Sequence, residues 1–338
     1  MFEEKVMTAL KELNPDTKEE SLQLYLTQVK KIYFDVFKIS FNQKSSQLKI
    51  PWKKIEDYFD EKNYAMTTRA NYYSSLFNVF TALDYNKAIT GQIKKMRDKY
   101  KQQYKDIDDG LKSQKQEDNF VSATLLNKFI DDYTKKIEDG TFTEGTTADD
   151  KHLLQVWMIL KLLREYFFRN EIATLEFVRK KEYDASRKKD ETDRNMIVMD
   201  KKGWFISKNK YKTQKLYGEE KIPIEGQMLT DLKFYYEING AGMLFKSSFQ
   251  KGGTRPTKMT PNALSKYLIK WSKNNIPPLV LEDGSKKARS LSTTMIVKAF
   301  QSAKQGATKT ELKKDSKNRG NKPTTMMEVY VSTKEPEV

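Results

Sequence analysis

A tyrosine close to the C-terminus, with a set of cations before it, has the residue types needed for phosphate chemistry. Tyr330 lies nine positions after Asn321, which follows Gly320 in a segment rich in Lys and Arg. A phenol becomes a nucleophile when it loses its proton, and nearby cations favour this because its ordinary pKa is about 10. The same cations would stabilise charge on phosphate oxygens. The pattern suggests a hydroxyl nucleophile directed at a phosphodiester.

Two further candidate cations lie in the middle of the chain. Arg169 follows a long apolar helix pattern, and Glu171 two residues later could orient its guanidinium, whose planar fork matches phosphate oxygens. Lys212 lies between two strand patterns, where a hairpin could carry an ammonium group to a leaving oxygen. The alternatives are a surface arginine at a helix end and an ordinary lysine-rich turn, since four lysines lie between residues 208 and 215.

A third cluster, Lys286-Lys287-Ala288-Arg289, follows a turn pattern and precedes a helical pattern that begins at Thr293. Arg289 would therefore lie near a helix start, where backbone N–H groups favour anions. Simple surface charge or a nuclear localisation signal would also explain such a cluster. Tyr330 itself is one of 18 tyrosines and could be a packing anchor.

The charge of the chain narrows the class of partner. The 338 residues carry a formal net charge of +16, which favours a polyanion because each Lys or Arg near a phosphate releases a condensed counterion. From Lys251 to Lys322 there are 17 Lys or Arg against 4 Asp or Glu, so +13 of this charge lies in one stretch. That stretch also contains much of the candidate chemistry, so a nucleic acid is the expected partner.

Other functional classes are excluded by composition. The chain has no cysteine, which removes disulfides, thiolate zinc sites and cysteine nucleophiles, and its single histidine, His152, cannot form a histidine cluster for a metal. The most apolar run, Leu153 to Phe168, is interrupted by charged residues, and the N-terminus does not resemble a signal peptide. We expect a soluble intracellular protein without a membrane partner.

Two domains are expected from the length and the patterns. The first part has helical spacing over Ser21–Phe37 and Thr67–Leu83. Lys94 to Asp118 is rich in Lys, Gln and Asp and is typical of a solvated helix end and linker. We place the domain boundary there, which gives a helical domain at 1–117 and a second domain at 118–338.

The second part mixes helices with short strands. Helices are expected from Thr124 to Ile137 and through the apolar run, and later over 261–271, 293–302 and 325–331. Strand patterns occur at 195–199, 204–206 and 221–224, the first two flanking the hairpin turn Asp200 to Gly203. The fold class expected is mainly α with a small antiparallel β-sheet.

Taken in order, these residues resemble the tyrosine recombinase, or phage integrase, family. That family presents Arg, a hairpin Lys, His-x-x-Arg, Gly-His or Gly-Trp, and Tyr. The positions that match are Arg169, Lys212, Lys286, Arg289, Asn321 and Tyr330. The resemblance covers Phe120 to the C-terminus. The motifs Arg-Asn-Glu and Tyr-Lys-Thr-x-x-x-Tyr-Gly are similar to those of integrases of large DNA viruses, their virophages and related mobile elements.

The chain departs from the family pattern at three positions. Glu171 stands one position closer to its arginine than usual. Lys286 replaces the usual histidine, which removes a neutral-pH proton acceptor but keeps a cation. Asn321 replaces His or Trp, and its amide can still donate a hydrogen bond. The resemblance then implies a site whose acid and base work falls on its lysines.

The resemblance implies that 1–117 is a helical core-binding, DNA-binding domain and that 118–338 is the catalytic domain. The two would form a C-shaped clamp on double-stranded DNA, in which Tyr330 attacks a phosphate and forms a 3′-phosphotyrosine. The arginines would hold the non-bridging oxygens, Lys212 would protonate the leaving 5′-oxygen, and Lys286 and Asn321 would complete the phosphate cradle. No metal, ATP, other cofactor or small-molecule substrate is implied. A homotetramer on two DNA sites is the implied assembly.

Three alternatives remain open from the residues. A type IB-like topoisomerase or a telomere resolvase would use the same chemistry without exchanging strands. A catalytically inactive DNA-binding protein on the same fold would fit the missing histidine. A basic structural protein that packages nucleic acid would bind without a preferred site and without a role for Tyr330.

Overall fold

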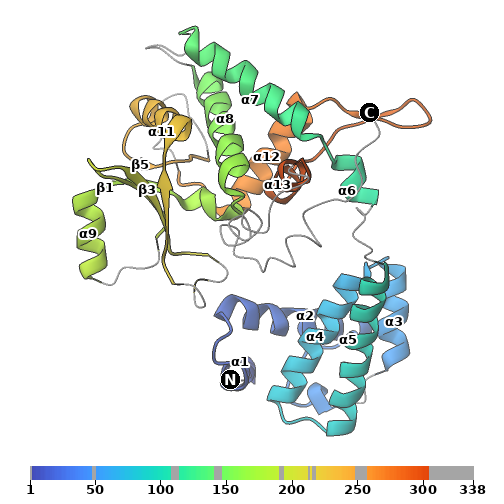
Figure 1. Cartoon of the computed structure of the whole chain (residues 1–338). Coiled ribbons are helices and arrows are strands. Elements are labelled where there is room, and N and C mark those ends of the chain that lie inside the picture. The colour runs from blue at the N-terminus through green and yellow to red at the C-terminus, as the bar shows by residue number, and fades with distance from the viewer. Residues whose placement is uncertain are drawn as a thin grey trace. The chain divides into compact units, whose positions relative to one another are not determined.

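The computed structural model describes residues 2–47, 51–107, 114–140, 147–189, 194–211, 214, 218–247 and 257–303 (Figure 1). The chain divides into two compact units, Met1–Asp109 and Gly110–Val338, called here the N-terminal and the C-terminal unit. The sequence predicts this boundary between residues 117 and 118. The separate roles expected of the two parts stay predictions.

The described residues of the N-terminal unit form helices and their connections. These are α1 (Phe2–Leu13), α2 (Glu19–Phe37), the 3-10 turn η1 (Ser45–Gln47), α3 (Trp52–Glu61), α4 (Met66–Ala82) and α5 (Lys87–Ile107). The central helix is α4, which contacts α1, α2 and α5 and buries Tyr73, Leu76 and Phe80 at helical spacing. Helices α2 and α4 confirm the two expected from the sequence in this region.

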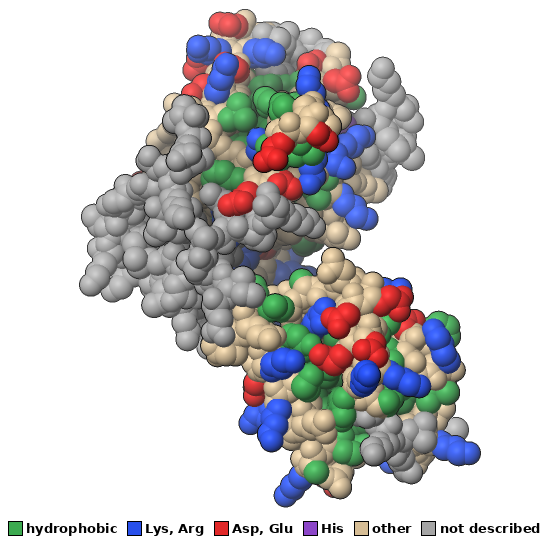
Figure 2. Space-filling model, turned by 90° about the vertical axis from the view of Figure 1, so that its right-hand side faces the viewer, with side chains coloured by type: hydrophobic (Ala, Val, Ile, Leu, Met, Phe, Trp, Pro, Cys, Tyr) green, Lys and Arg blue, Asp and Glu red, His purple; other side chains and the backbone are tan. Residues whose placement is uncertain are grey.

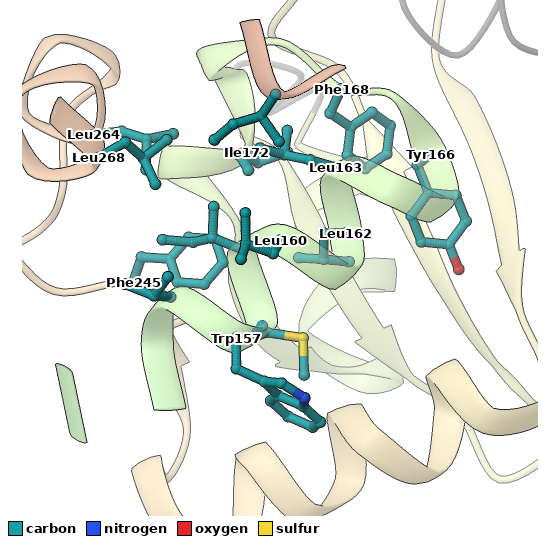
Figure 3. Packing of buried hydrophobic residues seen from close by; sticks show 14 of the residues in the cluster. Trp157, Leu160, Leu162, Leu163, Tyr166, Phe168, Ile172, Phe245, Leu264 and Leu268 are labelled. Carbon is teal, nitrogen blue, oxygen red and sulfur yellow. The ribbon is translucent and has the colours of Figure 1, made fainter. Parts of the chain in front are cut away.

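The helices of the C-terminal unit surround one deeply buried helix, α8 (Ala148–Tyr166). It begins with a capping box between Thr147 and Asp150 and is buried along its whole middle, from Leu154 to Leu163. Figure 3 shows its side chains packed against those of neighbouring segments, with Ile172 next to Leu163. The other described helices are α6 (Gln114–Asn119), α7 (Ala123–Glu138), η2 (Asn170–Thr174), α9 (Lys180–Lys188), α11 (Gly226–Asn239), α12 (Pro261–Asn275) and α13 (Thr293–Ser302).

A five-stranded sheet lies within the same unit. Its strands are β1 (Glu176–Arg179), β2 (Met196–Met199), β3 (Trp204–Lys208), β4 (Glu220–Ile224) and β5 (Gly242–Met243), in the order β4-β3-β2-β1-β5. The expected turn joins β2 to β3, with the N–H of Gly203 donating to the carbonyl of Asp200 over 3.2 Å. Gly203 has a φ of 151°, which favours glycine at this position.

The sheet is mixed rather than purely antiparallel. Strands β1 and β2 pair in parallel, because α9 carries the chain back before β2 begins, whereas the other pairs are antiparallel. A separate two-stranded ribbon consists of β6 (Leu279–Val280) and β7 (Lys286–Lys287). The mainly α fold with a small sheet is thus confirmed, while the helix expected over 325–331 lies outside the described residues.

Candidate active site

The structure describes three of the six candidate residues. Arg169 lies between α8 and η2, Lys286 is in β7, and Arg289 lies between β7 and α13. Lys212, Asn321 and Tyr330 lie outside the described residues. Their places in a site therefore stay predictions.

The turn after α8 fixes the backbone at Arg169. Phe167 ends the helix in the left-handed conformation, with φ of 50°, and its N–H donates to the carbonyl of Leu163. Phe167 and Phe168 are both buried in the core of the unit, so the hydrophobic core holds this strained turn in place. Arg169 follows in an extended conformation and is half-buried. The sequence placed it at a helix end, and the structure adds this buried aromatic turn.

Asn170 joins the Arg169 segment to the segment that contains Arg289. Its Nδ2 donates to Ser265 Oγ of α12 over 3.0 Å, and its Oδ1 accepts from the hydroxyl of Thr293. Thr293 is the first residue of α13 and lies four positions after Arg289. Residues more than a hundred positions apart in the sequence are thus tied together by one amide side chain.

Arg289 is held from two sides. Its Nη1 donates to the backbone carbonyl of Phe120, and its own carbonyl accepts from Ser272 Oγ of α12 over 3.2 Å. The same Ser272 oxygen accepts from the N–H of Leu291 over 2.9 Å. Burial lowers the pKa of the Arg289 guanidinium, which Asp118 opposes, but an arginine stays charged at neutral pH.

Lys286 is placed differently from the two arginines. Its backbone pairs with Val280 in the two-stranded ribbon, and its side chain is exposed. The next residue, Lys287, forms an ion pair of 2.7 Å with Asp118. The cation at the position of the family's histidine therefore lies on a solvent-facing ribbon.

A buried lysine, Lys208, lies beside Arg169 and was not singled out from the sequence. Its side chain is 2% exposed, and its Nζ lies 3.6 Å from Glu171 Oε1 and 3.7 Å from Glu220 Oε2. Burial lowers its pKa, the two carboxylates oppose this, and the charge of Arg169 adds to the lowering. Glu171, expected to orient Arg169, thus has Lys208 as an ion-pair partner.

The strand pattern could have revealed Lys208. Residues 204, 206 and 208 share one face of β3, and Ile206 on that face is fully buried. Glu220 lies directly opposite Lys208 in β4, with Ile222 and Ile224 on the same face. A lysine and a glutamate at apolar positions of neighbouring strands indicate a buried ion pair.

Asn195 connects η2 with the backbone that leads toward Lys212. Its Oδ1 accepts from the N–H groups of Asn209 and Lys210, at 2.9 and 2.7 Å. Its Nδ2 donates to the carbonyl of Lys210 over 3.0 Å and to Thr174 Oγ1 over 3.2 Å. The side chain is 2% exposed, so these bonds replace the hydrogen bonds to water that the amide loses on burial.

The hydroxyl of Tyr211 links two described residues on either side of Lys212, namely Tyr211 and Gly218. It donates to the carbonyl of Gly218 over 2.8 Å, and its ring lies 4.5 Å from the ammonium of Lys208. Glu219 then accepts from Tyr183 and from Ser207, at 2.8 and 2.6 Å. Tyr211 and Gly218 are therefore tied to each other, and Glu219 is tied to α9 and β3.

Metal sites and membrane-spanning helices are two other features that the described residues could form. Within them, no group of three or more His, Asp or Glu side chains is placed to hold a metal ion. Among the helices that the structure describes, none is long and apolar enough to span a membrane. On the face in Figure 2, Lys and Arg lie among Asp and Glu on both units.

Comparison with known proteins adds a likeness of fold. No model of a known protein family matches the sequence, and no curated protein matches it. The structure is similar to that of the Tn1549 transposon integrase in complex with transposon right end DNA, with a TM-score of 0.51 and 15% sequence identity. The match covers 99% of this chain and 96% of that chain. At this identity the likeness shows a shared fold, and the chemistry must be argued from the residues.

Proposed function

We propose that this protein is a tyrosine recombinase that cleaves and rejoins double-stranded DNA. The fold it shares with a DNA-bound transposon integrase supports this, as does its net charge of +16. The single observation that carries the proposal is the hydrogen bond from Thr293 to Asn170, which ties together the segments of Arg169 and Arg289. Two guanidinium groups on one phosphate would stabilise the charge that develops in phosphoryl transfer.

In the proposed reaction the phenolic proton of Tyr330 passes to water, because nearby cations favour the phenolate, and the phenolic oxygen attacks a backbone phosphorus. A bond forms between the phenolic oxygen and phosphorus, and the bond from phosphorus to the 5′-oxygen breaks. Lys212 protonates that oxygen, which leaves as a 5′-hydroxyl. The neutral Lys212 then takes the proton of a second strand's 5′-hydroxyl, whose oxygen attacks the phosphorus. The bond from phosphorus to Tyr330 breaks, the phenolate regains a proton from water, and the DNA is rejoined. Because the phosphotyrosine keeps the bond energy, neither a metal nor ATP is required.

The cations have separate roles in this proposal. Arg169 and Arg289 bind the non-bridging oxygens as their charge grows, and Lys286 and Asn321 complete the cradle. The exposure of Lys286 fits a group that meets the DNA backbone as it docks. Lys208 is too buried to contact DNA, and it fixes Glu171 and the start of η2.

We extend the proposal to assembly and to subgroup. Exchange between two DNA molecules needs two pairs of cleaved strands, so a homotetramer on two sites is the expected assembly. The local sequence around Arg169 and Lys212 supports an integrase of the kind carried by large DNA viruses, virophages and related mobile elements.

The test is capture of a covalent protein–DNA adduct. Purified protein is incubated with a pool of randomised duplexes nicked at varied positions, so that a cleaved fragment diffuses away and the adduct accumulates. Adducts that survive denaturation are isolated and their DNA is sequenced. We expect enrichment of one site and a denaturant-stable adduct with the unmodified protein.

Two variants decide what the adduct means. Tyr330→Phe should bind the same DNA with the same affinity and form no adduct, whereas Tyr104→Phe, an exposed tyrosine of α5, should form as much adduct as the unmodified protein. Site-specific binding without any adduct would support an inactive DNA-binding protein instead. An adduct that religates its own strand and never joins a second duplex would support a topoisomerase or resolvase.

A further inference from the structure

The chain that enters the C-terminal unit runs against the candidate arginine near α13. Three successive residues, Asp118, Asn119 and Phe120, contact the segment from Lys287 to Ser290. Asp118 forms an ion pair with Lys287 over 2.7 Å, and the side-chain oxygen of Asn119 accepts from the N–H of Ser290. The carbonyl of Phe120 accepts from the Arg289 guanidinium.

These contacts restrict the side chain of Arg289. A guanidinium has five N–H donors in one plane, so fixing Nη1 on a carbonyl sets the orientation of the others. Behind it, Ser272 holds the Arg289 carbonyl and the N–H of Leu291. The arginine is therefore fixed at its backbone and at its tip, which is the preorganisation that phosphate stabilisation needs.

The carbonyl of Phe120 is itself held in place. Asn119 is the last residue of α6, and the N–H of Phe120 donates to the carbonyl of Glu117 over 3.0 Å. Ser122 caps α7, accepting from the N–H of Leu125 over 3.2 Å. The phenyl ring of Phe120 packs against the core of the unit. A short connection between two helices thus presents its carbonyl to Arg289 in a fixed direction.

Asn119 determines the register of this contact. Its Oδ1 bonds the residue directly after Arg289, so it holds the two backbones at the distance at which the Phe120 carbonyl meets the guanidinium. Without the Asn119 oxygen, the backbone N–H of the half-buried Ser290 would lose its hydrogen-bond acceptor. The segment would then shift toward solvent and carry Arg289 with it.

We infer that Asn119 is a positioning residue for strand cleavage, acting on the phosphate through Arg289. The inference rests on the proposed function, since it assigns Arg289 to the reacting phosphate. It also makes the end of α6, just after the boundary between the two units, part of the supporting structure of the site.

The experiment compares adduct formation and DNA binding in four proteins at saturating DNA. Asn119→Ala removes the acceptor, and it should slow adduct formation by about 10- to 100-fold while leaving DNA affinity unchanged, because a small displacement of a catalytic group costs rate. Asn119→Asp keeps the acceptor and should restore the rate to within about 3-fold. Asn127→Ala is the matched control: it removes another half-buried amide, the acceptor of an Arg164 hydrogen bond of 3.1 Å, and should leave the rate unchanged.

A double variant separates positioning from general destabilisation. If Asn119 acts through Arg289, adding Asn119→Ala to an Arg289→Lys protein should slow it no further, because the guanidinium to be positioned is already gone. An equal slowing in both backgrounds, or an unchanged rate in the single Asn119→Ala protein, would overturn the inference. If Arg289→Lys forms no measurable adduct, the inference is tested by the adduct-formation rates of Asn119→Ala and Asn119→Asp alone.

Failure of this inference can be told apart from failure of the proposed function. An Arg289→Ala protein that forms adduct at the normal rate would remove the function assigned to Arg289, and with it the role of Asn119. Loss of adduct in Arg289→Ala together with a normal rate in Asn119→Ala would leave the function standing and reject the positioning role.

Discussion

Two regions of the C-terminal unit bury a lysine, and they do so in different ways. Between α8 and α11, Lys161 forms a direct ion pair with Asp231, and its ammonium lies 4.8 Å from the ring of Trp157. Between η2, β3 and β4, Lys208 faces two carboxylates at 3.6 and 3.7 Å and lies 5.2 Å from the ring of Phe168. Each lysine side chain is almost completely buried, at 5% and 2% exposure.

The difference shows what each lysine does. The Lys161 region is a closed pair, which joins two helices within the core. The Lys208 region is a network of several charges, in which Lys208 pairs with two carboxylates and the nearby charge of Arg169 lowers the pKa of Lys208. Burying several charged groups together is costly for stability, and buried ionisable clusters occur often at functional sites. The charged groups beside Arg169 thus cost stability, which the packing of the rest of the unit must offset.

The largest expected effect comes from removing each lysine. Lys208→Met and Lys161→Met should each lower the free energy of unfolding by about 3 to 5 kcal/mol, because buried carboxylates lose their counter-charge. Only Lys208→Met should also slow adduct formation, by about 100-fold, since Glu171 and the turn at Arg169 would relax. Chemical denaturation, together with adduct assays at a temperature where both proteins stay folded, measures the two quantities.

A double variant serves as the control for this comparison. Lys161→Met with Asp231→Leu should recover most of the lost stability, because a hydrophobic pair replaces the ion pair without leaving a charge. Equal loss of activity in Lys208→Met and Lys161→Met would show that the two regions do not differ in function.

The second prediction concerns the amide that links η2 to the segment before Lys212. Asn195→Ala leaves the N–H groups of Asn209 and Lys210 without their acceptor. We expect a loss of about 1 to 3 kcal/mol in the free energy of unfolding. Adduct formation should slow in addition, whereas DNA affinity should stay the same. A variant that loses stability but keeps its full rate would restrict Asn195 to a structural role.

The smallest predicted effect is a pH dependence from the half-buried His152. Burial lowers its pKa below the ordinary value of 6.5, and Lys270 adds to this while Asp149 opposes it. The unfolded chain therefore binds the proton first as pH falls, so stability should decrease below about pH 6.5, by at most about 1.4 kcal/mol per pH unit. Thermal unfolding of the protein and of His152→Gln at pH 7 and pH 5 measures the contribution, since the variant lacks it. An identical pH dependence in both proteins would contradict this assignment.

Much of the architecture could be predicted from local patterns. The apolar run before Arg169, the helix from Thr293 and the turn at Gly203 each depend on neighbours in sequence, and the structure confirms all three. The parallel pairing of β1 with β2 could not be foreseen in this way, because it depends on where α9 returns the chain.

The site was harder to predict, because its contacts join distant segments. The bond between Asn170 and Thr293 spans 123 residues, and the one between Arg289 and Phe120 spans 169. Spacing in the sequence identified Arg169 and Arg289 as candidates, but it does not show what holds them. The alternation of buried and exposed positions in β3 could have predicted that Lys208 is buried. Asn119 and Asn195, in contrast, lie in no sequence pattern that distinguishes them from ordinary polar residues.

The most direct measurement is the identity of the residue bonded to DNA. A trapped adduct is digested with protease and nuclease, and the peptide that keeps a nucleotide is sequenced by mass spectrometry. The account predicts a 3′-linked nucleotide on Tyr330, lost in Tyr330→Phe and strongly reduced in Arg169→Ala and Arg289→Ala. A nucleotide on any other residue, or an adduct that forms equally well without either arginine, would contradict it.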